Sequence, residues 1–186
     1  RNILSDPSGE KKAKAALTQA VFGKAVSKEA LEFANVLAGY RWSKGGDLVA
    51  AFTQLGVFTI AGIVAKDKKL EELEAELFAF NQALASDRDL QTAFSSRQAS
   101  LEAKLELIHA LTNNKVSEAA SILLRNAVIN ARNVRLAVML DGFIKQVSAY
   151  AARLVAYVTV ATALSANQLE RLEASLSKTY GQEINL

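Results

Sequence analysis

The run from Leu48 to Ala65 limits most strongly what this chain can fold into. Its eighteen residues, LVAAFTQLGVFTIAGIVA, carry no charge and lie between Asp47 and Lys66. That length is at the lower limit for a membrane-spanning helix. Thr53, Gln54 and two glycines interrupt the apolar run, and no second run of this kind follows. We therefore predict a helix buried on nearly all sides within a helical protein, with a membrane span as the alternative.

Composition favours a mainly helical fold. The chain has 186 residues, of which 51% are hydrophobic, with one proline, nine glycines and no cysteine. Without cysteine it has neither disulfides nor thiolate metal ligands. A net charge of +3 permits contact with acidic partners but does not indicate a nucleic-acid-binding protein. The chain begins at Arg1 without a methionine, so we expect it to be a fragment.

Capping residues predict where the helices begin and end. Ser27, Asp47 and Ser86 each precede a helical pattern and can accept hydrogen bonds from its free amides. Gly23 and Asn113 each follow an apolar stripe, and we expect both to end helices with positive φ.

An internal repeat relates two parts of the chain. Asn113 lies ninety positions after Gly23, and at the same offset Val26-Ser27 matches Val116-Ser117. With one inserted residue, the next matches pair Phe33, Val36, Leu37, Tyr40 and Arg41 with Leu124, Ala127, Val128, Ala131 and Arg132. The spacing predicts a duplicated helical unit, although helices rich in Ala and Leu also produce chance matches. If the repeat is real, helices equivalent to Leu70–Phe94 should precede Arg1.

The residue composition changes in the C-terminal part of the chain. Residues 157–160 are aromatic or β-branched, which is typical of a strand. A helix is expected over Ala166–Tyr180 and a second strand over 183–186, so more strands should follow. The predicted fold is mainly α, a multi-helix bundle in which duplication of one helical unit is an interpretation of the repeat, followed by the start of a small α/β domain. The predicted domains are an extra helical segment over 1–46, a helical bundle over 47–156 and the truncated α/β domain over 157–186.

The sequence contains no catalytic constellation, and we predict no enzyme activity, cofactor or metal. His109 has no partner that would make it a general base. The acidic run Glu71–Glu76 fits a solvated helix face better than a metal site, which needs ligands from several segments. Three arginines, Arg125, Arg132 and Arg135, are expected to be surface charges, because no aromatic residues alternate with them as in RNA-binding surfaces.

Three stretches carry a resemblance to a known family. Lys69–Leu77, KLEELEAEL, follows an apolar helix and resembles the second helix of the delta subunit of F-type ATP synthase, the oligomycin-sensitivity-conferring protein of mitochondria. Residues 158–186, VTVATALSANQLERLEASLSKTYGQEINL, resemble the junction of that family with its C-terminal domain. Residues 1–44, with Asp6-Pro7-Ser8 and Arg41-Trp42-Ser43, resemble the extra segment of the long actinobacterial form, which is fused behind a stalk-type helix.

The resemblance implies a non-catalytic stator that ties the catalytic head to the peripheral stalk. Its partners would be the amphipathic N-terminal helix of an alpha subunit and a b-type stalk subunit, with no nucleic acid and no membrane span in this chain. The complex would lie at the cytoplasmic face of the bacterial plasma membrane. Gly56-Val57 stands where the family has Tyr-Ala, and the glycine-rich C-terminal end is absent, which leaves stalk binding by this chain open.

The resemblance also implies a groove between helices at about Gly56–Lys66 and Ser117–Ala131. Helical spacing then places six residues on its walls: Phe58, Gly62 and Ala65 on one helix, and Ala119, Leu123 and Asn126 on the other. Leu124, Ala127 and Val128, with Val57, Ile60, Ala61 and Val64, would face the bundle. The alternatives are that both faces are core, or that the chain is a helical regulatory or nucleic-acid-binding module.

Overall fold

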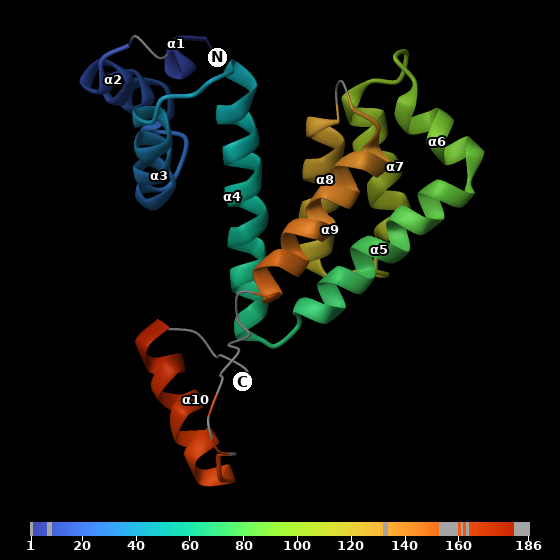
Figure 1. The fold of residues 1–186 in the computed structure, drawn as a ribbon. Coiled ribbons are helices and arrows are strands. Elements are labelled where there is room, and N and C mark those ends of the chain that lie inside the picture. The colour runs from blue at the N-terminus through green and yellow to red at the C-terminus, as the bar shows by residue number, and fades with distance from the viewer. Residues whose placement is uncertain are drawn as a thin grey trace. The chain divides into compact units, whose positions relative to one another are not determined.

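The computed structural model describes residues 2–6, 9–131, 134–152, 160, 162 and 164–180, and the regular structure in these ranges is entirely helical (Figure 1). The helices are α1 Asn2–Ser5, α2 Lys11–Phe22, α3 Lys28–Gly39, α4 Gly45–Lys66, α5 Leu70–Ser86, α6 Arg88–Ser95, α7 Leu101–Thr112, α8 Glu118–Asn130, α9 Leu136–Ala152 and α10 Ala166–Tyr180. The predicted mainly α fold is confirmed. Apart from Val160, which has no regular structure, the predicted strands lie outside the described residues.

The chain forms two compact units, Arg1–Gly56 and Val57–Leu186, and α4 contributes to both. In the first unit α2 packs on α3. Ala34 and Ala38 of α3 are buried there, together with Thr18 of α2, whose Oγ1 donates to the carbonyl of Lys14 at 2.8 Å. This small core contrasts with that of the second unit.

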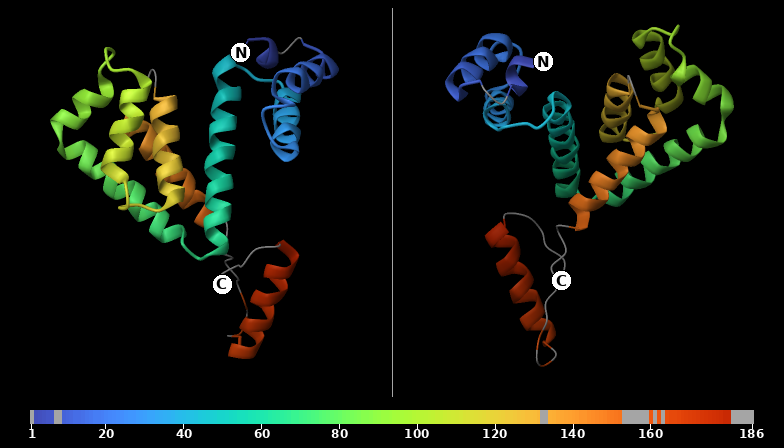
Figure 2. Two further views of the ribbon diagram at one scale, coloured as in Figure 1. Left: turned by 180° about the vertical axis from the view of Figure 1, so that it is seen from behind. Right: turned by 45° about the horizontal axis from the view of Figure 1, so that its top comes forward.

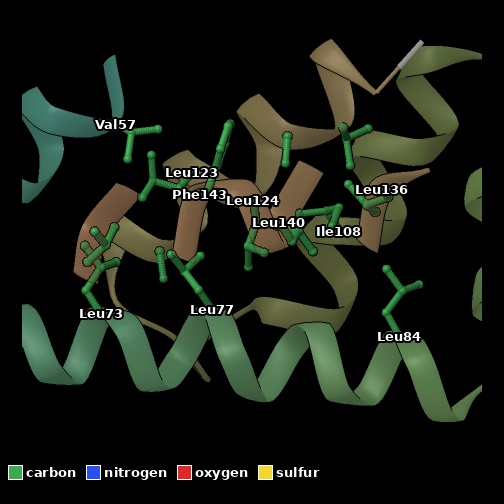
Figure 3. Close-up of a cluster of buried hydrophobic side chains, with 14 of the residues drawn as sticks. Val57, Leu73, Leu77, Leu84, Ile108, Leu123, Leu124, Leu136, Leu140 and Phe143 are labelled. Carbon is green, nitrogen blue, oxygen red and sulfur yellow. The ribbon is translucent and has the colours of Figure 1, made fainter. Parts of the chain in front are cut away.

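The core of the second unit lies between α5, α7, α8 and α9. Figure 2 shows α5 alongside α9, and α8 packs against α5, α7 and α9. Leu73, Leu77 and Leu84 recur along α5 and point toward leucines of α8 and α9 (Figure 3). The other labelled core residues are Val57, Ile108, Leu123, Leu124, Leu136, Leu140 and Phe143. Apolar burial at about 25 cal/mol per Å² makes this layer the main source of stability in the unit.

The prediction that the apolar helix is buried on nearly all sides is wrong. Within α4 only Leu48, Val57 and Ala61 are buried, and 17% of its most apolar window is covered. The reason is that Leu48 belongs to one compact unit and the other two to the second, so each unit buries only a narrow stripe. Among the described residues α4 is the one helix that is long and apolar enough to cross a membrane, with a mean hydropathy of 2.0. Core helices of soluble proteins meet the same criteria of length and composition.

The predicted helix ends are right in position and partly wrong in geometry. Helices α2 and α7 do end before Gly23 and Asn113, but these residues have φ of −58° and −55°. The positive φ lies one residue later in the second case, at Asn114. Each helix is closed by a backbone bond from residue 23 or 113 to the carbonyl four residues earlier, which right-handed φ permits.

Two of the three predicted caps also shift. Ser27 caps α3 as predicted, because its side chain accepts from the amide of Ala30. Asp87, not Ser86, caps α6 by accepting from the amides of Asp89 and Leu90. Asp47 lies inside the first turn of α4 and accepts from the amide of Lys44 instead.

Candidate partner-binding faces

On α4, two of the predicted groove residues lie against α9. The rings of Phe58 and Tyr150 are 5.9 Å apart between centroids, in a tilted arrangement. A Cβ added at Gly62 would come 3.1 Å from the Tyr150 hydroxyl oxygen. Phe58, Gly62 and Ala65 are half-buried. The small residue at position 62 therefore makes room for a side chain of the same bundle.

On α8, the predicted anchor Leu123 is a core residue. Its exposed fraction is 2%, and Figure 3 shows it within the cluster beside Leu124. Leu123 follows Ala120 by three residues and precedes Ala127 by four, so it shares their buried face. The α8 residues that were predicted to face the bundle, Leu124, Ala127 and Val128, are buried as expected.

The outer face of α8 carries two isoleucines that sequence reasoning missed. Ile122 and Ile129 are 44% and 39% exposed. They are seven residues apart, and the half-buried Ala119 and Asn126 lie on the same side of the helix. If Ser117 is taken as the cap and Ala120 as a core residue, helical spacing places Ile122 and Ile129 on the outer face of α8. Of the three groove residues predicted on α8, Ala119 and Asn126 lie on this outer face and Leu123 does not.

Carboxylates of α5 fix the position of the neighbouring helices. Glu76 accepts from the amide of Ser117 at 2.6 Å and from its hydroxyl at 2.5 Å. Glu74 accepts from the hydroxyl of Ser148 on α9. The acidic run is therefore more than a solvated face, because two of its members bind serines from other helices. Within the residues that the structure describes, no group of three His, Asp or Glu side chains is arranged to hold a metal ion.

Trp42, which the sequence also singled out, has a local structural role. Trp42 donates from Nε1 to the carbonyl of Leu37 at 2.8 Å, and its ring meets that of Tyr40 edge-on. Trp42 thus covers the end of α3. Arg125 is exposed on α8 and Arg135 precedes α9, whereas Arg132 lies outside the described residues.

These features define a helical-bundle protein that presents apolar helix faces on its surface. The family model for the "ATP synthase delta (OSCP) subunit" matches residues 57–186, beginning at the first residue of the second compact unit. The chain belongs to this family of non-catalytic subunits, as the sequence predicted.

Relatives called "ATP synthase subunit delta" match the whole chain. The protein of Pseudarthrobacter chlorophenolicus is 37% identical over 195 residues, and that of Renibacterium salmoninarum is 38% identical over 191. The Streptomyces griseus protein is 33% identical over 186 residues. Each alignment covers all of this chain, and it covers 70%, 70% and 69% of the length of the three relatives, in that order.

Proposed function

We propose that this chain is a stator subunit of ATP synthase that ties the catalytic head to the peripheral stalk by holding an amphipathic N-terminal helix of an alpha subunit. A b-type stalk subunit is the second proposed partner, and the cytoplasmic face of the plasma membrane is the proposed location. Membership of the delta family supports the assembly role.

The observation that carries this proposal is the uncovered apolar surface of α4 and α8. On α4, Val57 and Ala61 enter the core, while Ile63 is 56% exposed. On α8, Ile122 and Ile129 are exposed in the same way. A partner helix with apolar residues at i, i+3, i+4 and i+7 could cover such faces and recover the free energy of their burial.

The structure changes which side chains should contact the partner. Ile122 and Ile129 replace Leu123 in the proposed α8 wall, beside the predicted Ala119 and Asn126. On α4, Phe58, Gly62 and Ala65 stay as predicted, and the exposed Ile63 is added as a contact on another side of the helix. A leucine at Gly62 would meet Tyr150 first, so Gly62→Leu tests bundle packing as well as the groove.

A titration with a peptide of an alpha-subunit N-terminal helix tests the proposal. Ile122→Asp should weaken binding at least about tenfold, which corresponds to about 1.4 kcal/mol. Val138→Asp, at a valine of α9 that is 57% exposed, is the matched control and should change affinity less than about twofold. Equal affinity of wild type and Ile122→Asp would exclude this face.

We also propose that residues 1–46 belong to a repeat of the unit over 47–156, with the α/β domain beginning at 157. In support, α2 and α7 both have twelve residues, and Ser27 and Ser117 cap the following helices with nearly the same φ and ψ. Replacing residues 23–27 with the sequence of 113–117 tests this, since equivalent turns should cost less than about 1 kcal/mol. A chain that no longer folds would count against the repeat.

A further inference from the structure

A cleft of about 1270 Å³ opens in the second unit, and Ile129 is the one residue of the proposed groove that also lines it. It is bounded by the C-terminal ends of α5 and α8, by α6, and by the first turns of α7 and α9. Its apolar wall includes Ile129 and Val134, which are 39% and 45% exposed. The volume exceeds that of a single oxyanion and suits a ligand of at least nucleotide size.

Four basic side chains line this cleft. Arg88, Arg97, Lys104 and Arg135 come from four separate segments, and no Asp or Glu is among the described lining residues. The two ion pairs seen in the described part of the chain, Lys69–Glu72 and Lys145–Asp141, lie elsewhere. Like charges repel when they are brought together without counterions, so this arrangement favours an anionic ligand.

The start of α9 adds to the positive potential. Leu136 and Ala137 form the beginning of the helix and both line the cleft. The first turn of α9 contains no acidic residue, so its side chains do not offset the positive end of the helix dipole. The sequence placed Arg135 among surface charges, and the structure brings it together with three cations from other segments.

We propose that this cleft binds an organic polyphosphate, a ligand with several linked phosphate groups and an apolar ring. Three of the four cations are arginines, whose planar guanidinium groups pair with phosphate oxygens in two-point contacts. Four positive charges match the charge of a triphosphate better than that of a single carboxylate. The apolar wall of Ile129 and Val134 offers a surface for the ring. The cleft adjoins the proposed partner-binding face of α8 at Ile129, whereas its four basic residues lie outside that face.

Titration of the whole 186-residue chain with ATP and with inorganic triphosphate, both without magnesium and at low salt, tests the proposal. Calorimetry should detect both anions, with ATP the tighter because its base covers the apolar wall. The double variant Arg97→Gln with Arg135→Gln should lose at least about tenfold in affinity for both. Amide NMR signals of Leu136 and Ala137 should shift on binding to wild type.

The control removes the same charge elsewhere. Lys115→Gln with Arg125→Gln changes two exposed cations outside the cleft and should alter affinity less than about twofold. Equal losses of affinity in the two double variants would show that binding depends on net charge alone, and would overturn the site. Absence of binding by wild type at millimolar anion would overturn it too. So would tighter binding of an acidic peptide such as residues 69–77, which would make the cleft a protein-docking surface.

Discussion

At the scale of single residues, one carboxylate joins two helices of the bundle. Glu76 of α5 accepts both hydrogen-bond donors of Ser117, the residue that caps α8. Hydrogen bonds to a charged acceptor contribute about 1.5–3 kcal/mol each, and an unpaired donor costs a similar amount when buried. The bond spans forty-one residues of sequence. It therefore fixes the register between α5 and α8.

We expect Glu76→Ala to lower the free energy of unfolding by about 1–3 kcal/mol, because it leaves the Ser117 donors without this acceptor. Chemical denaturation measures the change. Glu72→Ala is the control, since its pair with Lys69 is long, at 3.9 Å, and exposed. A double-mutant cycle with Ser117→Ala should show coupling between positions 76 and 117. Additive effects of the two changes would contradict the direct bond.

Replacing Gly23 or Gly56 with alanine should change the stability of the fold in opposite directions. At Gly23 an added Cβ would overlap the carbonyl oxygen and side chain of Gln19, although φ is right-handed. At Gly56, inside α4, it would meet nothing within 4 Å. Gly23→Ala should therefore destabilise, and Gly56→Ala should stabilise by about 0.5–1 kcal/mol through helix propensity and a less flexible unfolded chain. Thermal unfolding of both variants checks the signs, and a stabilising Gly23→Ala would refute the overlap.

At the scale of helices, most of the secondary structure could be predicted from the sequence. The Ser27 cap predicted the start of α3, and the helix expected over Ala166–Tyr180 is α10 with the same bounds. The burial of α4 could not be predicted, because composition shows how apolar a helix is and not how many neighbours cover it. For the same reason Leu123 was assigned to a groove: the difference between a core face and an open face of α8 depends on where α5 and α9 lie.

The start of α3 gives a prediction about pH. The pKa of Glu29 is lowered by a hydrogen bond to its own backbone amide and by one from Ser27. Because the folded-state pKa is below the unfolded one, the carboxylate stabilises the fold above the unfolded pKa. This contribution is lost as pH falls through the folded pKa. NMR titration should place the Glu29 midpoint below that of an ordinary glutamate. Ser27→Ala should raise the midpoint, and an unchanged midpoint would contradict the role of Ser27.

At the scale of the whole molecule, the two compact units differ in how much apolar surface they bury. The buried hydrophobic residues of the first unit are Ala34, Ala38 and Leu48 among those described, whereas the second unit has a continuous cluster of leucines with Phe143. The first unit instead exposes large side chains on α3 and at its C-cap: Phe33, Val36 and the capping Tyr40 are 53%, 52% and 59% exposed. Stability should therefore be unevenly distributed along the chain.

Hydrogen exchange should resolve this difference in stability. Amides of α2 and α3 should exchange by local opening at a lower free energy than amides of α5, α8 and α9, because opening the first unit exposes less buried apolar surface. Leu140→Ala removes a fully buried side chain of the second unit and should cost about 2–5 kcal/mol there. The exchange of α2 and α3 should then change little, because their opening does not require the second core to open. Equal protection of α3 and α8 in the wild type, or equal loss in both units of the variant, would show that the chain unfolds as one cooperative body.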